Sequence, residues 1–268
     1  MAFLQDITLG QYYPADSFVH RLDPRTKIMG ILASMIALIA AHTFWELLIS
    51  FALLLAVIII SKLPPLLVLR NLKPFIWLFL ITLIFHILLF SGGTILATVP
   101  LLKIHIYREG LLNGLLYSVR LAEFVLLAAV LTLTTSPMEI TDALDRFLSP
   151  FKRIGLPTHE FVLMITLALR FIPTLITEAD RLRKAQLSRG AVFEGNLLQR
   201  LKSVIPLIVP LFISVFKRAD DLAIAMDSRC YVGGRNRTSF KMLTFGYADY
   251  AVFIGLMLYV LIFFIIGG

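Results

Sequence analysis

The chain has 268 residues, of which 59% are hydrophobic and 16% are charged, and it carries a formal net charge of +8 at pH 7. Ordinary soluble domains contain roughly 45–50% apolar and about 25% charged residues. With a mean hydropathy of +0.87, part of the surface must be solvated by a lipid bilayer, which excludes a soluble globular enzyme. A single cysteine, Cys230, excludes a secreted scaffold held by internal disulfides.

Five stretches of the chain are apolar and long enough to predict membrane-spanning helices, since a helix needs about 20 apolar residues to cross a bilayer. In chain order they cover residues 28–45, 47–61, 74–91, 110–135 and 250–268. The second is short and becomes adequate if the side chain of Lys62 extends to the interface. The fourth contains two ionisable residues, Arg120 and Glu123. We therefore expect an all-α polytopic membrane protein with about five transmembrane helices.

The basic residues orient these five spans. Cytoplasmic loops of membrane proteins are enriched in Lys and Arg, so the positive net charge does not indicate a nucleic-acid partner. With the N-terminus inside, the three predicted cytoplasmic segments contain 22 of the 25 basic residues. We therefore expect a cytoplasmic N-terminus and an external C-terminus.

The region between the fourth and fifth spans is predicted to form amphipathic helices on the cytoplasmic side of the membrane. Two long helices, over about residues 160–189 and 203–229, are each apolar at first and charged at the end. The apolar part of the second helix, residues 203–216, is about 21 Å long, which is too short to cross and too apolar to lie in water. The predicted organisation is residues 1–135 with four spans, 136–245 with the cytoplasmic helices, and 246–268 with the last span.

The charged ends of these two helices repeat each other at a shift of 40 residues. Residues 179–190 and 219–230 are identical at six of twelve positions, and both contain a terminal Ser-Arg pair. An arginine near a helix C-terminus also stabilises an ordinary helix end, particularly before a glycine. Because a guanidinium group suits a buried docking contact and occurs at both ends in one register, we interpret Arg189 and Arg229 as docking residues for two similar sockets.

Along nearly its whole length the chain resembles the transmembrane T component, EcfT, of bacterial energy-coupling factor (ECF) transporters. Residues 10–17, Gly-Gln-Tyr-Tyr-Pro-Ala-Asp-Ser, and 20–27, His-Arg-Leu-Asp-Pro-Arg-Thr-Lys, are similar to the opening signature of that family. Ser-Arg-Gly at 188–190 and Ser-Arg-Cys at 228–230 match its paired Ala-Arg-Gly motifs. Serine replaces alanine in both motifs and Cys230 replaces the second glycine, so the arginines are kept while the fine geometry differs.

The resemblance implies a non-catalytic coupling subunit of the bacterial cell membrane. In that family two ABC-type ATPases dock on the arginine-bearing helices, and a substrate-binding membrane protein, the S component, packs on apolar faces of the cytoplasmic helices. The ATPases bind ATP with magnesium and reorient the S component, which releases a vitamin or other micronutrient inside. Carried over to this chain, the ATPase-docking residues are Ser188, Arg189, Gly190, Ser228, Arg229 and Cys230. The residues expected in the S-component platform are Phe161, Leu167, Phe171, Leu175, Leu207, Leu211 and Phe212.

Motifs for chemistry of its own are missing from this sequence. It has no GxxxxGK[ST] phosphate loop, and His159-Glu160 is not followed by the second histidine of a zinc protease. His86 and Cys230 are each interpreted as packing residues. We therefore expect no catalytic residue, bound metal or cofactor in this chain.

Arg120 and Glu123 leave a different hypothesis open. Ionisable groups inside a span often mark an ion or substrate path, which would suit a self-contained secondary carrier, whereas their i, i+3 spacing favours a structural pair. A membrane-embedded enzyme would need clustered acidic or histidine residues near the interface, and the sequence has none at a suitable spacing. A conventional ABC importer permease is a closer rival, but it would dock its ATPases through one coupling helix per subunit instead of two.

Overall fold

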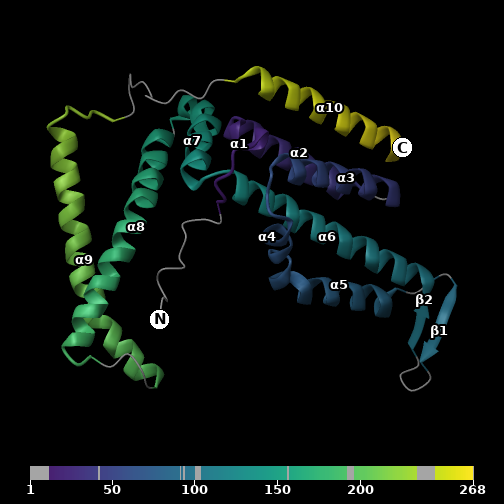
Figure 1. The fold of residues 1–268 in the computed structure, drawn as a ribbon, viewed down its shortest axis with the longest axis horizontal. Helices are drawn as coiled ribbons and strands as arrows, with labels where there is room; N and C mark the ends of the chain where they lie inside the picture. The colour runs from purple at the N-terminus through teal and green to yellow at the C-terminus, as the bar shows by residue number, and fades with distance from the viewer. Residues whose placement is uncertain are drawn as a thin grey trace. The chain divides into compact units, whose positions relative to one another are not determined.

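The computed structural model describes residues 12–41, 43–90, 92, 94–99, 104–155, 157–191, 196–233 and 245–267. Contacts between Cα atoms divide the chain into two units (Figure 1). Residues 10–136 and 242–268 form the first, which we call the bundle unit, and the second, the arm unit, contains residues 137–241. Gly10 and Gln11 of the opening signature lie outside the described residues.

The bundle unit is built from helices of very different lengths. They are α1 (Phe18–Arg21), α2 (Pro24–Ala40), α3 (Phe44–Ile60), α4 (Pro65–Arg70), the 3₁₀-helix η1 (Lys73–Phe75), α5 (Ile76–Leu89), α6 (Arg108–Thr134) and α10 (Tyr247–Gly267). A short antiparallel hairpin of β1 (Ile95–Val99) and β2 (Ile104–Tyr107) precedes α6. The predicted all-α fold class is confirmed, and the hairpin is an addition that the sequence analysis did not predict.

The break between α2 and α3 lies earlier than predicted. The predicted first span, residues 28–45, continued to Trp45, but α2 ends at Ala40 and Trp45 belongs to α3. The reason is a capping arrangement, in which the backbone N–H of Thr43 donates a hydrogen bond of 2.6 Å to the carboxylate of Glu46. Such a reciprocal cap starts a new helix even within an apolar run.

Several helices are apolar enough for a bilayer. Within the described ranges, Pro65–Leu89, Arg108–Thr134 and Thr158–Ser188 are long and apolar enough to cross a membrane, while Phe44–Ile60 and Tyr247–Phe263 are apolar but shorter. These helices support a polytopic membrane protein. Thr158–Ser188 is the first of the two long helices that the sequence analysis placed on the cytoplasmic side, and that placement stays a prediction.

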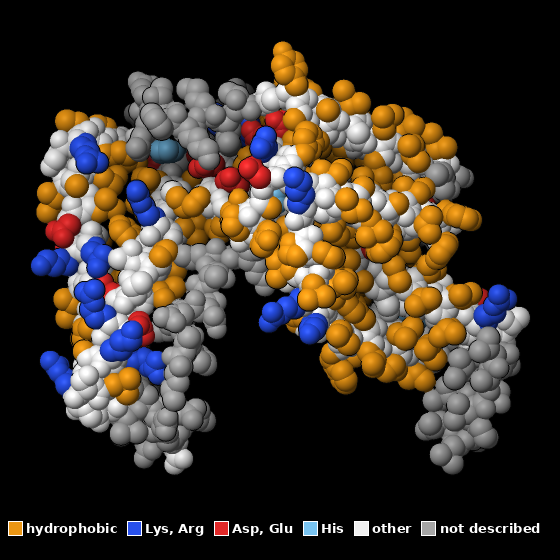
Figure 2. Space-filling model, viewed as in Figure 1, with side chains coloured by type: hydrophobic (Ala, Val, Ile, Leu, Met, Phe, Trp, Pro, Cys, Tyr) orange, Lys and Arg blue, Asp and Glu red, His pale blue; other side chains and the backbone are white. Residues whose placement is uncertain are grey.

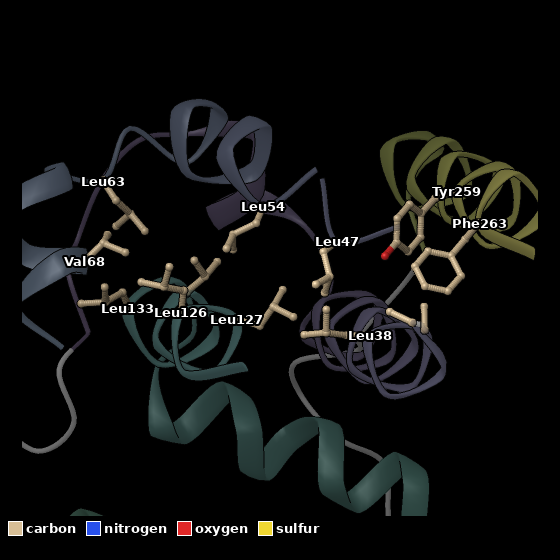
Figure 3. Close-up of a cluster of buried hydrophobic side chains, with 13 residues drawn as sticks. Leu38, Leu47, Leu54, Leu63, Val68, Leu126, Leu127, Leu133, Tyr259 and Phe263 are labelled. Carbon is tan, nitrogen blue, oxygen red and sulfur yellow. The ribbon is translucent and has the colours of Figure 1, made fainter. Parts of the chain in front are cut away.

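The core of the bundle unit lies where α2, α3, α6 and α10 meet (Figure 3). Leu38, Leu54, Leu133 and Phe263 are each at most 1% exposed and belong to these four helices in turn. Lipid tails are as apolar as these side chains, so close van der Waals packing, more than removal from water, holds such helices together.

Two glycines allow α6 to approach α5 closely. A Cβ atom at Gly110 would lie 2.9 Å from the carbonyl oxygen of His86, and one at Gly114 would lie 3.1 Å from the His86 Cβ. This four-residue spacing of small residues is typical of tightly packed membrane helices. The ring of His86 packs on Tyr117 at 4.6 Å, and its Nδ1 lies 2.8 Å from the carbonyl oxygen of Thr82. The interpretation of His86 as a packing residue is therefore confirmed.

The arm unit contains the helices that the sequence analysis singled out. They are α7 (Pro137–Leu148), the 3₁₀-helix η2 (Ser149–Ile154), α8 (Thr158–Ser188) and α9 (Leu197–Asp227). The two long predicted helices, residues 160–189 and 203–229, are confirmed, and α9 begins six residues earlier than expected. The periodicity of their apolar residues and the helix-ending residues after each explain this agreement.

Candidate docking surface of the arm unit

The helices α8 and α9 pack against each other in opposite directions. An apolar groove of about 310 Å³ runs between them, and its lining includes Met164 and Leu175 of α8 and Val215 and Met226 of α9. Beside this groove, Glu178 of α8 accepts two hydrogen bonds from α9. They come from the Ser214 hydroxyl at 2.5 Å and from the Arg218 guanidinium group at 2.6 Å.

The contact between Glu178 and Arg218 joins equivalent positions of the 40-residue repeat. Where two antiparallel helices touch at equivalent positions, a local two-fold axis passes through the contact. From this point each helix continues for eleven residues to its arginine, Arg189 or Arg229, without a proline. Each such stretch is about 16 Å long. The two arginines therefore lie at opposite ends of the helix pair, about 33 Å apart along it.

The end of α8 is a regular left-handed helix cap. Gly190 adopts a positive φ of +85°, and the N–H of Ala191 donates a hydrogen bond of 3.0 Å to the carbonyl oxygen of Gln186. This six-residue closure is the Schellman motif, which satisfies carbonyl groups at a helix end. The Ser188 hydroxyl donates to the carbonyl oxygen of Lys184 at 3.1 Å.

The end of α9 reproduces each of these features 40 residues later. Cys230 adopts a positive φ of +55°, and the N–H of Tyr231 donates to the carbonyl oxygen of Met226 at 3.1 Å. The Ser228 hydroxyl donates to the carbonyl oxygen of Ile224 at 2.8 Å. Cys230 therefore occupies the backbone position of a glycine, and because it is exposed its interpretation as a packing residue is wrong. The repeat seen in the sequence is also a repeat in backbone geometry.

The six predicted docking residues are all exposed in the arm unit: Ser188, Arg189, Gly190, Ser228, Arg229 and Cys230. Basic side chains are visible along this unit in Figure 2. Neither arginine is part of an ion pair among the described residues, so both guanidinium groups are available to a carboxylate or to carbonyl groups of another molecule. The interpretation of these residues as a docking site stays a prediction.

The predicted platform residues divide into two sets. Phe161 and Phe212 are each 58% exposed and available to a partner. Leu167, Phe171 and Leu175 line the groove between α8 and α9, so much of their surface packs within the arm unit. The remaining two, Leu207 and Leu211, are half-buried.

A continuous apolar stripe on α9 lies within the apolar segment that the sequence analysis identified, but only Phe212 of its six members was among the named platform residues. It consists of Ile205, Ile208, Val209, Phe212, Ile213 and Phe216, each between 45% and 64% exposed. Their spacing of three and four residues places them on one face of the helix. The spacing was visible in the sequence, but which face α9 turns toward α8 was not.

Arg120 and Glu123 are not paired as expected. Arg120 donates a hydrogen bond to the backbone oxygen of Ala41, and its guanidinium carbon lies 5.0 Å from the ring centre of Tyr117. Glu123 is 1% exposed, beside Ser50. No direct salt bridge joins the two charges in the described part of the bundle unit, although the charge of Arg120 acts on the Glu123 carboxylate.

Residues of the opening signature hold the start of α10. Asp23 caps α2, and its side chain accepts hydrogen bonds of 2.9 Å from the backbone and guanidinium N–H groups of Arg25. Its own backbone N–H donates to Asp249 of α10 at 2.9 Å, and Asp249 also accepts from Gly246 N–H at 2.8 Å. Burial raises the pKa of Asp23, but the hydrogen bonds and the charge of Arg25 outweigh it and hold that pKa below its usual value. The Arg25 guanidinium carbon lies 4.1 Å from the ring centre of Phe245.

A second signature residue, Lys27, holds the end of α6. It is 6% exposed, and its ammonium group donates hydrogen bonds of 3.0 Å to the carbonyl oxygens of His20 and Thr134. Thr134 is the last residue of α6, where a positive charge is favoured by the helix dipole. The signature therefore has a structural role in the bundle unit, which the sequence analysis had used only as a family marker.

Comparison with known proteins identifies the family of this helical membrane protein. The family model CbiQ, described as cobalt transport protein, matches residues 15–240. The energy-coupling factor transporter transmembrane protein EcfT of Acidaminococcus fermentans is 47% identical over 249 residues, which cover 92% of this chain and 91% of that protein. The protein of the same name from Heliobacterium modesticaldum is 48% identical over 251 residues, and the one from Bacillus subtilis is 39% identical over 255 residues, with 93% or more of each chain covered.

The fold and these likenesses define a transporter membrane subunit of the helical, polytopic class. The chain belongs to the EcfT family, the transmembrane components of ECF transporters. As a member of that family it is part of an ECF transporter complex. The sequence-based assignment of the family is therefore confirmed.

Proposed function

We propose that this chain transmits the ATP-driven motion of two ABC-type ATPases to a substrate-binding S component, and thereby drives the uptake of a vitamin or other micronutrient. The chain itself is non-catalytic and binds no cofactor, because ATP and magnesium are held by the ATPases. It lies in the bacterial cell membrane with its N-terminus in the cytoplasm and its C-terminus outside, in keeping with the distribution of basic residues.

The observation that carries this proposal is the matched pair of helix ends. The helix ends at Arg189 and Arg229 are closed by the same pattern of backbone hydrogen bonds. Both arginines lie eleven residues beyond the Glu178–Arg218 contact and are related by the local two-fold axis at that contact. Such a surface fits two similar sockets that are themselves related by a two-fold axis. A pair of ABC-type ATPases that close on each other would present sockets of this kind, and their movement would act on both ends at once.

The apolar stripe on α9 supports the second partner. Six exposed apolar side chains along one helix face are costly in water and favour a partner of similar character. An S component, itself an apolar membrane protein, would cover this stripe. Phe212 lies at its centre and, with Phe161 of α8, is the platform residue that remains exposed in the arm unit.

The proposal is tested by affinity purification of the chain from its native membrane in mild detergent, followed by mass spectrometry. We expect the wild type to retain two ATPase subunits and a small hydrophobic membrane protein. The double variant Arg189→Glu/Arg229→Glu is expected to lose the ATPases, whereas Arg146→Glu, a charge reversal at an exposed arginine of α7, retains them. If the purified chain alone transports substrate in liposomes, it is a self-contained carrier and the proposal is wrong.

A further inference from the structure

A deep apolar cavity of about 290 Å³ lies within the bundle unit. It is lined by residues of α1, α2, α3, α6 and α10. Leu54 of α3 and Leu127 of α6 line the cavity and are buried in the core (Figure 3), whereas Phe18 and Ile60, which also line it, are exposed. The cavity therefore leads from the outer surface of the bundle unit into its core.

Four polar side chains line the cavity, but their polar atoms are either engaged or buried. The Lys27 ammonium group and the hydroxyl groups of Ser34 and Thr134 donate hydrogen bonds to backbone carbonyl oxygens. The hydroxyl oxygen of Thr26 is buried. Because a water molecule inside a protein needs about two to four polar partners, this cavity suits a hydrocarbon group better than water.

The size of the cavity favours a long, flexible occupant. Along α2 its lining extends from Thr26 to Ser34, a distance of about 12 Å. A methylene group is close in size to a water molecule, which occupies about 30 Å³, so the cavity has room for roughly ten methylene groups. A single leucine or phenylalanine side chain from a partner protein would leave most of this space empty.

Two helical glycines contribute to the open space. Gly30 of α2 and Gly255 of α10 both line the cavity, and a Cβ atom at either position would meet nothing within 4 Å. Glycine is less favourable than alanine inside a helix, so neither helix needs it for its own stability. A larger side chain at either position has room, and it would take up part of the cavity.

A basic residue follows the exposed rim of the cavity. Lys62 lies two residues after Ile60, is exposed, and takes no part in a salt bridge among the described residues. The start of α2 and the ends of α3 and α6 all lie on the cytoplasmic side in the proposed orientation. A lysine at this level of the membrane attracts the phosphate group of a phospholipid.

We propose that this cavity binds one acyl chain of an inner-leaflet phospholipid, with the headgroup at the rim near Ile60 and Lys62. The helices that line the cavity are apolar enough to lie in a bilayer, so lipid chains surround its opening. A bound chain supplies the dispersion contacts that the walls of an empty cavity would lack. The inference goes beyond the proposed function and does not depend on the ATPases or the S component.

A phospholipid with a photoreactive diazirine group in its acyl chain tests the proposal. The full chain is reconstituted into vesicles of phosphatidylethanolamine and phosphatidylglycerol that contain the photoreactive phosphatidylglycerol, irradiated, and mapped by peptide mass spectrometry. We expect labelling at Leu54 and Leu127, because both are buried and a lipid chain reaches them by entering the cavity. Labelling at Ile36, which is exposed on α2, serves as the bilayer reference.

Variants that fill the cavity should remove this labelling. Gly30→Leu/Gly255→Leu is expected to lower the labelling of Leu54 and Leu127 by roughly fivefold or more, since the chain loses its contacts there, and to leave Ile36 unchanged. Ala128→Leu is the control, because Ala128 is exposed on α6 and does not line the cavity. Lys62→Gln keeps the cavity open and should lower the labelling about threefold through the headgroup alone.

The wild-type chain alone can overturn the proposal. If Ile36 is labelled and Leu54 and Leu127 are not, no lipid chain enters the cavity, whether or not the glycine variants fold. Wild-type labelling in the double glycine variant, or an equal loss in Ala128→Leu, also overturns it, and an unchanged yield in Lys62→Gln overturns the placement of the headgroup. None of these results depends on whether ATPases are purified with the chain, so the proposed function is tested separately.

Discussion

Arg218 of α9 donates a hydrogen bond of 2.6 Å to Glu178 of α8, and the two residues are equivalent positions of the internal repeat. This contact lies midway between the two exposed arginines and joins the two halves of the arm unit at their local two-fold axis. The Ser214 hydroxyl of α9 also donates a hydrogen bond to Glu178, so two side-chain hydrogen bonds from α9 end on this one carboxylate.

Removal of this contact should loosen the helix pair. We expect Glu178→Ala to destabilise the packing of α8 on α9 by about 1 kcal/mol, a value reduced for the 41% exposure of the Arg218 side chain. Hydrogen–deuterium exchange should become faster in both helices. Asp180→Ala is the control, because Asp180 pairs with Lys184 on the same helix and its loss leaves the contact between helices intact. Equal exchange in the two variants would contradict the role of Glu178.

Reversal of a single docking charge should already weaken ATPase association. Arg189→Glu or Arg229→Glu is expected to lower the affinity by roughly 30-fold or more, which is the typical effect of breaking a buried charged contact. Uptake should fall with it, while membrane insertion stays normal. Arg120→Leu, inside the bundle unit, should retain ATPase association. An arginine whose reversal leaves uptake at the wild-type level is not a docking residue.

Cys230 should be replaceable by glycine with a gain in stability. Its positive φ of +55° is unfavourable for a residue with a Cβ atom, so Cys230→Gly should stabilise the end of α9 by about 1 kcal/mol. Gly190→Ala at the equivalent position should destabilise the end of α8 by a similar amount. Local amide exchange at the two helix ends measures both effects, and slower exchange in Gly190→Ala would be inconsistent with this account.

The close contact between α5 and α6 predicts a steric effect of one methyl group. Gly110→Ala places a Cβ atom 2.9 Å from the backbone oxygen of His86, so the helices must separate, and we expect a loss of about 1–3 kcal/mol. A Cβ atom at Gly255 of α10 would meet nothing within 4 Å. Gly255→Ala should therefore leave the thermal unfolding temperature in detergent close to that of the wild type. A similar temperature for all three proteins would show that α5 and α6 are not held by this contact.

The cap at Asp23 predicts a dependence of stability on pH. The pKa of Asp23 is lower in the folded protein than its ordinary value, so the ionised carboxylate stabilises the fold above about pH 4, and this contribution is lost as the pH falls through the folded-state pKa. Asp23→Asn should lower thermal stability at pH 7 by about 1–2 kcal/mol. The difference from the wild type should shrink in acid. Asp16→Asn, at a side chain that is 90% exposed, should show neither effect.

Local signals explain which parts of the fold were predictable from the sequence. The ends of α8 and α9 were visible because Gly190 and the repeated Ser-Arg pair are local helix-ending features. The start of α3 was missed because the apolar run through residues 28–45 concealed the cap that Thr43 and Glu46 form. The hairpin was missed because β1 and β2 are only 5 and 4 residues long. Such short strands between apolar helices give little local signal in the sequence.

Long-range packing explains what the sequence could not show of the candidate surface. Each predicted docking residue belongs to a short motif at one helix end, so it could be recognised without knowing how the helices pack. The platform depends on which face α8 and α9 turn toward each other, so Leu167 and Phe171 were assigned to a partner although they line the groove inside the arm unit. The Glu178–Arg218 contact depends on the same packing and joins unlike residues, so the comparison of identical positions did not reveal it.

Two residues at the start of α2 contact the two segments, the end of α6 and the start of α10, at which the chain leaves and re-enters the bundle unit. Lys27 binds the carbonyl group of Thr134, just before the chain departs, and Asp23 binds Asp249, just after it returns. Asp23 and Lys27 are separated by about one helical turn, so the end of α6 and the start of α10 are held side by side within the bundle unit. The arm unit is thus an insertion into a single loop of a membrane protein, and insertions with adjacent ends are gained or replaced with little effect on their host. A chain in which a short glycine-serine linker replaces residues 137–241 should still form the bundle.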